Sequence, residues 1–407
     1  MSTSDQSSNS ENAQSSLVHI FIIFLKLGLT SFGGPIAHLA YFREEFVTKR
    51  RWLTEHAYAD LVALCQFLPG PASSQVGIAI GLSRGGVAGA FASWLGFTLP
   101  SFIALVMFAG LLTHVSGLSE GPWLHGLKVV AVAVVAQAIW GMSKTLCPDA
   151  RRATLAVISA MIVACAPGLY SQLGVIILSG IVGCLWLKHH HRLPHQPMQV
   201  PISKASGVII LSVFLLLLLL IPVMNDGYDS HLLAMFDSYF RAGSLVFGGG
   251  HVVLPLLQAE TVSQGWVSND LFLAGYGAAQ AVPGPLFTFA GYLGAVSNAE
   301  PNGLLGGAVA LAAIFLPAFL LVLGALPLWE SIRQYPAIQH AMLGINAAVV
   351  GLLIAAFYNP VWTSAILSSQ DFGLALLAFL MLIFWKLPPW LVVMIGAIAA
   401  TLLASAL

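Results

Sequence analysis

The chain carries the same set of helix-breaking residues twice, in the same order. The stretch "KLGLTSFGGPIAHLAYFREEFVTKRRW" at 26–52 precedes Pro69-Gly70-Pro71, and "RAGSLVFGGGHVVLPLLQAETVSQGW" at 241–266 precedes Pro283-Gly284-Pro285. Proline lacks a backbone donor and glycine is a poor helix former, so each of these sites interrupts a helix. We interpret the chain as a tandem duplication with two interruptions in each half.

Composition decides the setting in which this duplication folds. Of the 407 residues, 58% are hydrophobic and only 8% are charged, which leaves too little polar surface for a soluble domain. Runs such as "GVIILSVFLLLLLLIPV" at 207–223 suit a transmembrane helix and lack the alternation of a barrel strand. The sequence predicts an all-α polytopic membrane protein. Its formal net charge of zero gives no reason to expect a nucleic-acid partner.

The division into segments follows from the repeat. Residues 1–16 are rich in Ser, Asn and Gln and predict a disordered tail, without the basic start and cleavage site of a signal peptide. We expect one transport repeat at 17–187 and a second at 236–407. The linker between them, 188–235, contains one transmembrane helix.

Basic residues suggest that the two halves form an inverted-topology repeat. Lys and Arg favour cytoplasmic loops, and the cluster at 49–51 has no counterpart in the equivalent stretch 258–270. Half-helices of about ten residues are too short to span a bilayer, so 17–46 and 57–82 are predicted to be re-entrant. Simple spanning segments would also invert the halves, but they would place Arg84 across the membrane from the 49–51 cluster.

The paired interruptions predict a binding site. An isolated Gly-Gly usually indicates close helix packing, whereas interruptions at equivalent places of two halves are typical of a transporter site. The second half-helix at each break presents free N–H groups and a positive dipole end, which suit a small anion. We expect substrate or water to satisfy those donors. The predicted lining is Gly33, Gly34, Gly248, Gly249, Pro69, Gly70, Pro71, Pro283, Gly284 and Pro285.

Two intramembrane cations occupy matching positions in the repeats. Lys26 and Arg241 each lie within an apolar run, seven residues before a Gly-Gly pair. A charge there is costly unless it is paired or faces a wet cavity. We predict that both converge on the breaks and bind an oxyanion. The alternative is a structural ion pair, with Glu45 and Glu260 as the partners.

Further polar residues flank the breaks. Gln66 and Gln280 precede the two Pro-Gly-Pro sites, and hydroxyl groups follow them at Ser73, Ser74 and Thr288. We include these five among the predicted substrate ligands. A structural role is the alternative for each residue that could carry a coupled proton, namely Glu45, Glu260, Asp60, His38 and His251.

Other chemistries find little support in the residues. The four cysteines are scattered without metal-ligand spacing, and the histidines at 189–191 are read as a solvated linker rather than a metal site. There is no nucleotide-binding loop and no Ser/His/Asp grouping. We therefore expect no enzyme activity, no cofactor and no metal.

At these motifs the chain resembles the chromate ion transporter family in its long two-domain form. The family pattern of Gly-Gly, Val, Trp and Pro-Gly-Pro is found at Gly33-Gly34, Val47, Trp52 and Pro69-Gly70-Pro71. It recurs at Gly248-Gly249, Val262, Trp266 and Pro283-Gly284-Pro285, with one residue fewer before the Trp. The second copy has Gly250 and His251 where the first has Pro35 and Ile36, which suggests that the halves have specialised.

The resemblance implies a protein of the bacterial inner membrane that exports chromate, driven by the proton gradient, with sulfate as a competing anion. A transporter or channel for another oxyanion, such as a sulfate importer, stays open, as does a non-transporting membrane scaffold. The expected partners are a small inorganic oxyanion and membrane lipid. The sequence leaves a homodimer open.

Overall fold

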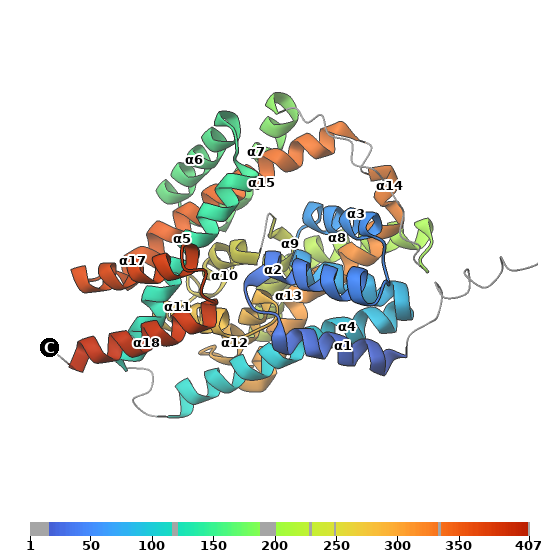
Figure 1. Cartoon of the computed structure of the whole chain (residues 1–407). Helices are drawn as coiled ribbons and strands as arrows, with labels where there is room; N and C mark the ends of the chain where they lie inside the picture. The colour runs from blue at the N-terminus through green and yellow to red at the C-terminus, as the bar shows by residue number, and fades with distance from the viewer. Residues whose placement is uncertain are drawn as a thin grey trace, which may run out of the picture.

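The computed structural model describes residues 16–115, 121–187, 201–227, 230–247, 250–332 and 335–405. Every regular element in these ranges is helical, so the prediction of an all-α fold is confirmed (Figure 1). Five helices are long and apolar enough to cross a membrane, at Ala72–His114, Pro122–Leu146, Lys204–Asn225, Gly303–Leu328 and Pro336–Ala365. Residues 1–15 of the predicted tail, Gly248, Gly249 and the 189–191 histidines lie outside the described residues.

The first half begins with short helices separated by the predicted breaks. These are α1 (Leu17–Thr30), α2 (Gly34–Arg43) with a π-helical continuation at Glu44–Lys49, α3 (Glu55–Phe67) and α4 (Ala72–His114). Gly85 and Gly86 leave helical geometry and divide α4 into 72–84 and 87–114. At 1.5 Å per residue, the pieces around the breaks are about 15–24 Å long, short of a bilayer core of about 30 Å.

The second half repeats this order. It consists of α9 (His231–Leu245), the 3-10 turn Gly250–Val252, α10 (Val253–Thr261), α11 (Asn269–Ala281), the 3-10 turn Leu286–Thr288, α12 (Phe289–Ala295) and α13 (Gly303–Ala325). Between the halves runs α8 (Lys204–Gly227). The first helix of this order, α9, begins at His231.

The broken segments fold into hairpins whose open ends meet at equivalent tryptophans. In the first half, Arg50 contacts His19 at the start of α1 (3.2 Å), and Arg84 donates to the Trp52 carbonyl (2.7 Å). In the second half, the His231 ring meets Trp266 edge-on at 4.7 Å, and Asn298 after α12 donates to the Trp266 carbonyl (2.9 Å). Each half is therefore a pair of hairpins with neighbouring open ends.

Glycines let the first hairpin arm of each half approach a long helix closely. A Cβ on Gly28 of α1 would lie 2.6 Å from the Phe97 carbonyl oxygen of α4. The equivalent Gly243 of α9 faces the Ile314 carbonyl of α13 in the same way. A side chain at either position would push the helices apart, so the glycines set this backbone-to-backbone packing.

The terminal helices exchange partners between the halves. The first half ends with α5 (Pro122–Leu146), α6 (Ala150–Cys165) and α7 (Leu169–Trp186). The second ends, after α14 (Trp329–Ile332), with α15 (Pro336–Ala356), a π-helical turn at Phe357–Trp362, α16 (Thr363–Ala365), α17 (Ser369–Ile383) and α18 (Pro389–Ser405). The α6–α7 hairpin packs on α15, and the α17–α18 hairpin packs on α5 (Figure 1). The two halves are therefore interlocked rather than placed side by side.

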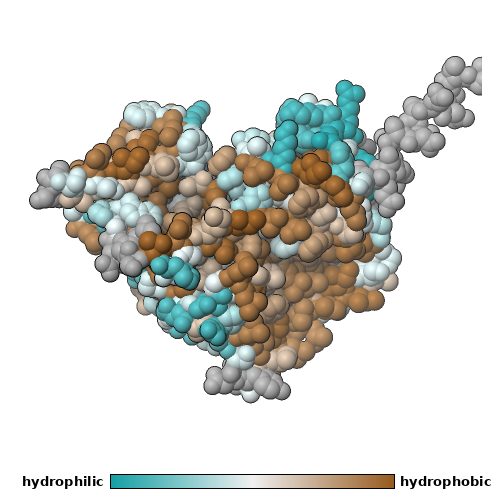
Figure 2. All heavy atoms as spheres, turned by 90° about the horizontal axis from the view of Figure 1, so that it is seen from below, coloured by the Kyte–Doolittle hydropathy of each residue, from teal (hydrophilic) through white to brown (hydrophobic). Residues whose placement is uncertain are grey.

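Large apolar side chains remain on the outside. Leu185 of α7, Leu219 of α8 and Met107 of α4 are 81%, 69% and 64% exposed. Figure 2 shows a broad hydrophobic surface, with hydrophilic side chains gathered toward its margins. An exterior of this kind is suited to lipid contact and is rare on soluble monomers.

Candidate functional site

The tips of the hairpins meet across the boundary between the halves. The Gly70 N–H donates to the Val246 carbonyl (2.6 Å), and the Gly284 N–H donates to the Ser31 carbonyl (3.0 Å). Each bond joins the Pro-Gly-Pro break of one half to the residue two positions before the Gly-Gly pair of the other. Gly70 corresponds to Gly284 in the repeat, and Ser31 corresponds to Val246. The two bonds are therefore equivalent, and together they bring all four breaks to one place.

These two bonds correct one expectation from the sequence. The donors at the Pro-Gly-Pro breaks were expected to meet substrate or water, but those of Gly70 and Gly284 are satisfied by the opposite half. The N–H groups left for a ligand by helix geometry are those of the first helical turn, which in α4 begins at Ala72.

Both Pro-Gly-Pro turns require glycine for their backbone conformation. Gly70 has φ +117° and Gly284 has φ +103°, values that L side chains rarely adopt. Space is also short, because a Cβ on Gly284 would lie 2.9 Å from the Ser101 hydroxyl and 3.2 Å from the Phe97 carbonyl. Sequence reasoning identified these turns correctly because their chemistry is local.

The two Gly-Gly segments also lie against each other. A Cβ on Gly34 would lie 3.8 Å from His251 Nε2, and one on Gly250 would lie 3.1 Å from Cγ of Pro35. Gly250 occupies the position in the second half that Pro35 occupies in the first. The absence of a second proline ring gives Pro35 room, which is a physical reason for this difference between the repeats.

Buried polar atoms gather beside the first Pro-Gly-Pro break. Gln75 Nε2 donates to the Pro69 carbonyl (2.7 Å), and the Ser73 hydroxyl lies 3.4 Å from His38 Nδ1. Two buried oxygens on the first turn of α4, Ser74 Oγ and Gln75 Oε1, have no hydrogen-bond partner within the described residues. Buried polar groups are normally paired, so these atoms are candidate ligand contacts.

The second Pro-Gly-Pro break is lined by different polar groups, including the Ser31 hydroxyl, which is buried without a partner in the described residues. The Thr288 hydroxyl donates to the Pro285 carbonyl (2.7 Å), while Gln280 Nε2 is buried without a partner in the described part of the chain. Gln66, the counterpart of Gln280, is exposed on α3. The predicted ligands therefore occupy unlike environments in the two halves.

The two predicted cations are also unlike. Arg241 Nη2 contacts Glu260 Oε2 at 3.0 Å and Asp237 Oδ2 at 3.2 Å, and the two carboxylate side chains are only 3% and 1% exposed. Lys26 is exposed on the face of α1 that carries Ile22 and Leu29. The two cations therefore do not converge in this structure, and Arg241 forms the alternative ion pair with Glu260.

The other predicted proton carriers each have a different partner. Glu45 pairs with Arg50 (2.7 Å) rather than with Lys26, and Asp60 accepts from Trp329 Nε1 (3.4 Å). His38 is buried against Phe97, and His251 Nδ1 contacts the Tyr276 hydroxyl (2.8 Å). In the described ranges, no group of His, Cys, Asp and Glu is arranged to hold a metal ion.

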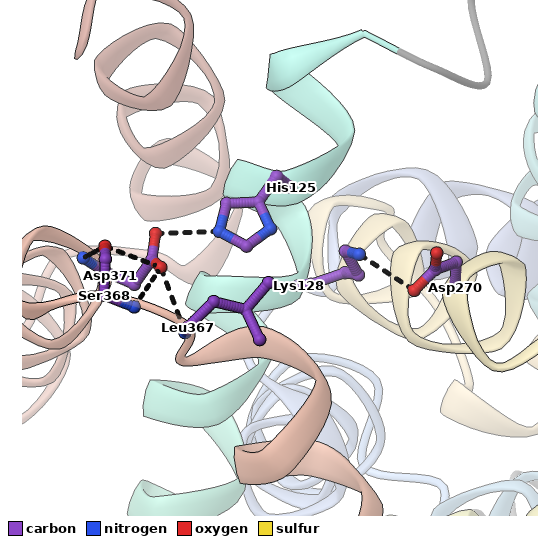
Figure 3. Close-up of polar contacts among 6 residues, drawn as sticks. All are labelled: His125, Lys128, Asp270, Leu367, Ser368 and Asp371. Carbon is purple, nitrogen blue, oxygen red and sulfur yellow. Dashed lines mark hydrogen bonds and ion pairs between the residues drawn. The ribbon is translucent and has the colours of Figure 1, made fainter. Parts of the chain in front are cut away.

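A polar cluster on α5 was missed by sequence reasoning (Figure 3). His125 Nε2 contacts Asp371 of α17 at 2.7 Å, and Lys128 Nζ contacts Asp270 of α11 at 2.9 Å. Asp371 also accepts from Ser368 in a capping box. The signal in the sequence was a His and a Lys three residues apart on an apolar helix, but their partners lie in the other half.

Comparison with known proteins assigns the family. The sequence model described as "Chromate transporter" matches residues 18–184 and, separately, 233–401. The chain belongs to the chromate transporter family. Two matches to one model indicate two repeats, and a family of transporters with these apolar helices makes the chain a multi-pass membrane transporter.

Several relatives resemble the chain over most of its length. A chromate transport protein from Cupriavidus metallidurans is 28% identical over 95% of this chain and 94% of its own length. A chromate transport protein from Pseudomonas aeruginosa is 27% identical over 82% and 78%. An uncharacterized transporter from Methanocaldococcus jannaschii is 28% identical over 84% and 83%. No solved structure matches the chain.

Proposed function

We propose that the protein exports chromate across the bacterial inner membrane, driven by the proton motive force, and thereby gives chromate resistance. The observation that carries the proposal is the reciprocal crossing of Gly70 with Val246 and of Gly284 with Ser31. It brings two broken-helix pairs from each repeat to one place, which is where transporters with inverted repeats bind their substrates. The names of the bacterial relatives support chromate as the oxyanion.

The chemistry of the crossing suits a tetrahedral dianion. The first turn of α4 offers backbone N–H groups together with the hydroxyls of Ser73 and Ser74, and both side chains are 3% exposed. The start of a helix carries a partial positive charge, and such ends bind oxyanions by hydrogen bonds from successive N–H groups. We infer that the substrate lies beside Ala72–Gln75, with Gly33 and Gly34 on the opposing tip.

Re-entrant hairpins in an inverted arrangement are part of the proposal. The contact of Arg50 with His19 brings the two ends of the α1–α2 segment together, as a re-entrant hairpin requires. Arg50 and Arg84 both lie over the Trp52 ring, at 5.7 Å and 5.1 Å from its centre. This supports placing Arg84 on the same side as the 49–51 cluster, whereas simple spanning segments would separate them.

The test is uptake of labelled chromate into inverted membrane vesicles, with and without an imposed proton motive force. Export predicts uptake that requires the driving force, and excess unlabelled sulfate tests selectivity. The matched variant replaces Pro69-Gly70-Pro71 with three alanines. We expect this variant to reach normal abundance in the membrane but to show no uptake. Uptake retained at normal abundance would mean that the break serves only in helix packing.

A further inference from the structure

We propose that Arg241 is a proton-controlled oxyanion ligand. Two buried carboxylates hold it in the described conformation, and a proton taken up by Glu260 releases it to the anion. The inference rests on the proposed function, since it assumes that the substrate is an oxyanion. It adds that proton and anion bind together, and it gives Asp237 a positioning role.

The contact geometry places one cation between two acids. Arg241 is on α9, Asp237 lies one turn earlier on the same helix, and Glu260 is near the end of α10. If both acids are ionised, the three side chains carry one net negative charge. Excess charge in a buried site is costly, and it would also repel an approaching dianion. A proton on one carboxyl group removes both penalties.

Glu260 is the acid best placed to take that proton. Its Oε2 contacts Arg241, while its Oε1 is buried and has no hydrogen-bond partner within the described residues. A proton can therefore be accepted there without breaking another bond. Asp237 is four residues from Arg241 on one helix, so it can retain a contact with the arginine when Glu260 becomes neutral.

The released guanidinium would lie near the crossing of the breaks. The Cβ position of Gly70 is 3.7 Å from the Gly243 carbonyl oxygen, and Gly70 bonds to Val246, so the end of α9 lies against the first Pro-Gly-Pro turn. Arg241 is about 7 Å from Val246 along the helix axis. Glu260 is near the C-terminal end of α10, and the Gly-Gly break lies before the N-terminal end of that helix. The ion pair with Glu260 therefore holds the Arg241 side chain away from the breaks.

The charged and titratable groups on neighbouring elements are few. On α9 itself, His231 contacts the Ser297 hydroxyl at 3.3 Å, and Tyr239 is buried. The helix α13 has no titratable residue, and the titratable residues of α8 are Lys204 and Asp226. On the elements packed against α10, His340 belongs to α15, Tyr170 and Cys184 belong to α7, and the preceding turn carries His251, which contacts Tyr276.

The first half has no equivalent arrangement of a cation between two buried carboxylates among the described residues. Glu45, the counterpart of Glu260, pairs with Arg50 at the open end of the hairpins, and Lys26 is exposed. The two halves keep the same residue types at these positions but use them differently. Proton control of the anion therefore belongs to the second half.

The coupling has a defined sign. Because protonation of Glu260 favours anion binding, anion binding must favour protonation to the same degree. Chromate affinity therefore falls as the pH rises, and the proton moves with the anion. A dianion carrying one proton still has one negative charge, so the membrane-potential part of the proton motive force drives it outward, while the pH gradient opposes it.

The first experiment uses the wild-type protein alone. Chromate added to purified protein in weakly buffered detergent solution should cause proton uptake, measured with an indicator dye against a protein-free blank. Proton release, or no change at saturating chromate, overturns the inference. If the wild-type protein binds no chromate at any pH, the proposed function itself fails, so the two failures are distinguishable.

The second experiment compares chromate affinity with pH in Glu260→Gln and in the matched variant Glu45→Gln. Wild type and Glu45→Gln should lose affinity by up to tenfold per pH unit. Glu260→Gln should lose less, because an amide stands in for the protonated acid. Chromate itself becomes protonated as the pH falls, and this changes the measured affinity of every variant equally. Comparing the affinities of the three proteins at the same pH removes this effect. An unchanged pH slope in Glu260→Gln contradicts the inference. If that variant does not accumulate, the proton-uptake measurement decides.

Discussion

The backbone N–H of Gly70 donates to the carbonyl of Val246, 2.6 Å away in the opposite half of the chain. With the equivalent bond from Gly284 to Ser31, it explains how a membrane protein tolerates helices broken twice in each repeat. In hydrocarbon an unpaired backbone donor is costly, and here each half supplies the acceptor that the other needs. The breaks therefore hold the halves together as well as exposing helix ends.

Replacing Gly70 by alanine tests this crossing. A φ of +117° is strained for alanine, and we expect a loss of about 1–3 kcal/mol in stability together with reduced transport. Thermal unfolding in detergent, followed with the transport assay, measures both effects. Gly141→Ala is the control, since that glycine lies on exposed α5 surface with no atom within 4 Å of the added Cβ. Equal stability of the two variants would show that the turn is not constrained.

Ser74 is predicted to be a substrate ligand. Its hydroxyl is buried without a hydrogen-bond partner among the described residues, so Ser74→Ala should weaken chromate binding by tenfold or more. The reason is that a hydrogen bond to a charged group contributes about 1.5–3 kcal/mol. Binding is measured beside membrane abundance, with Ser212→Ala on the exposed face of α8 as the control. Unchanged affinity would assign the hydroxyl to packing.

Arg241 and Lys26 are predicted to respond differently to the same substitution. Arg241→Gln leaves two buried carboxylates without their cation, at a cost of about 3–5 kcal/mol, so its membrane abundance should fall. Adding Glu260→Gln leaves only Asp237 without its cation, so it should restore part of the abundance but not chromate binding. Lys26→Gln should keep normal abundance, because the side chain is exposed. Quantitative blotting with a binding assay separates these outcomes, and full binding by the double variant would remove Arg241 from the site.

Cysteine labelling tests the inverted arrangement of the halves. Ser263 and Lys49 are exposed in equivalent hairpin loops. A membrane-impermeant thiol reagent added to intact cells should label Ser263→Cys but not Lys49→Cys, and inverted vesicles should give the opposite result. The background protein should lack the four native cysteines. Labelling of both positions from one side would rule out an inverted repeat.

The sequence by itself determined the class of fold and the places where helices break. Apolar length predicts helices, and Pro-Gly-Pro interrupts them wherever it occurs, because these effects depend on a residue and its immediate neighbours. The doubled order of the breaks also identified two repeats and pointed to their meeting place.

Only the tertiary structure decided which groups meet. Lys26 and Arg241 occupy matching sequence positions, yet one is exposed and the other lies between two buried acids. The partner exchange of the terminal hairpins and the contact of His125 with Asp371 likewise have no local signal. Such contacts depend on how distant helices pack, and that packing is set by the summed shape of both halves rather than by any single segment.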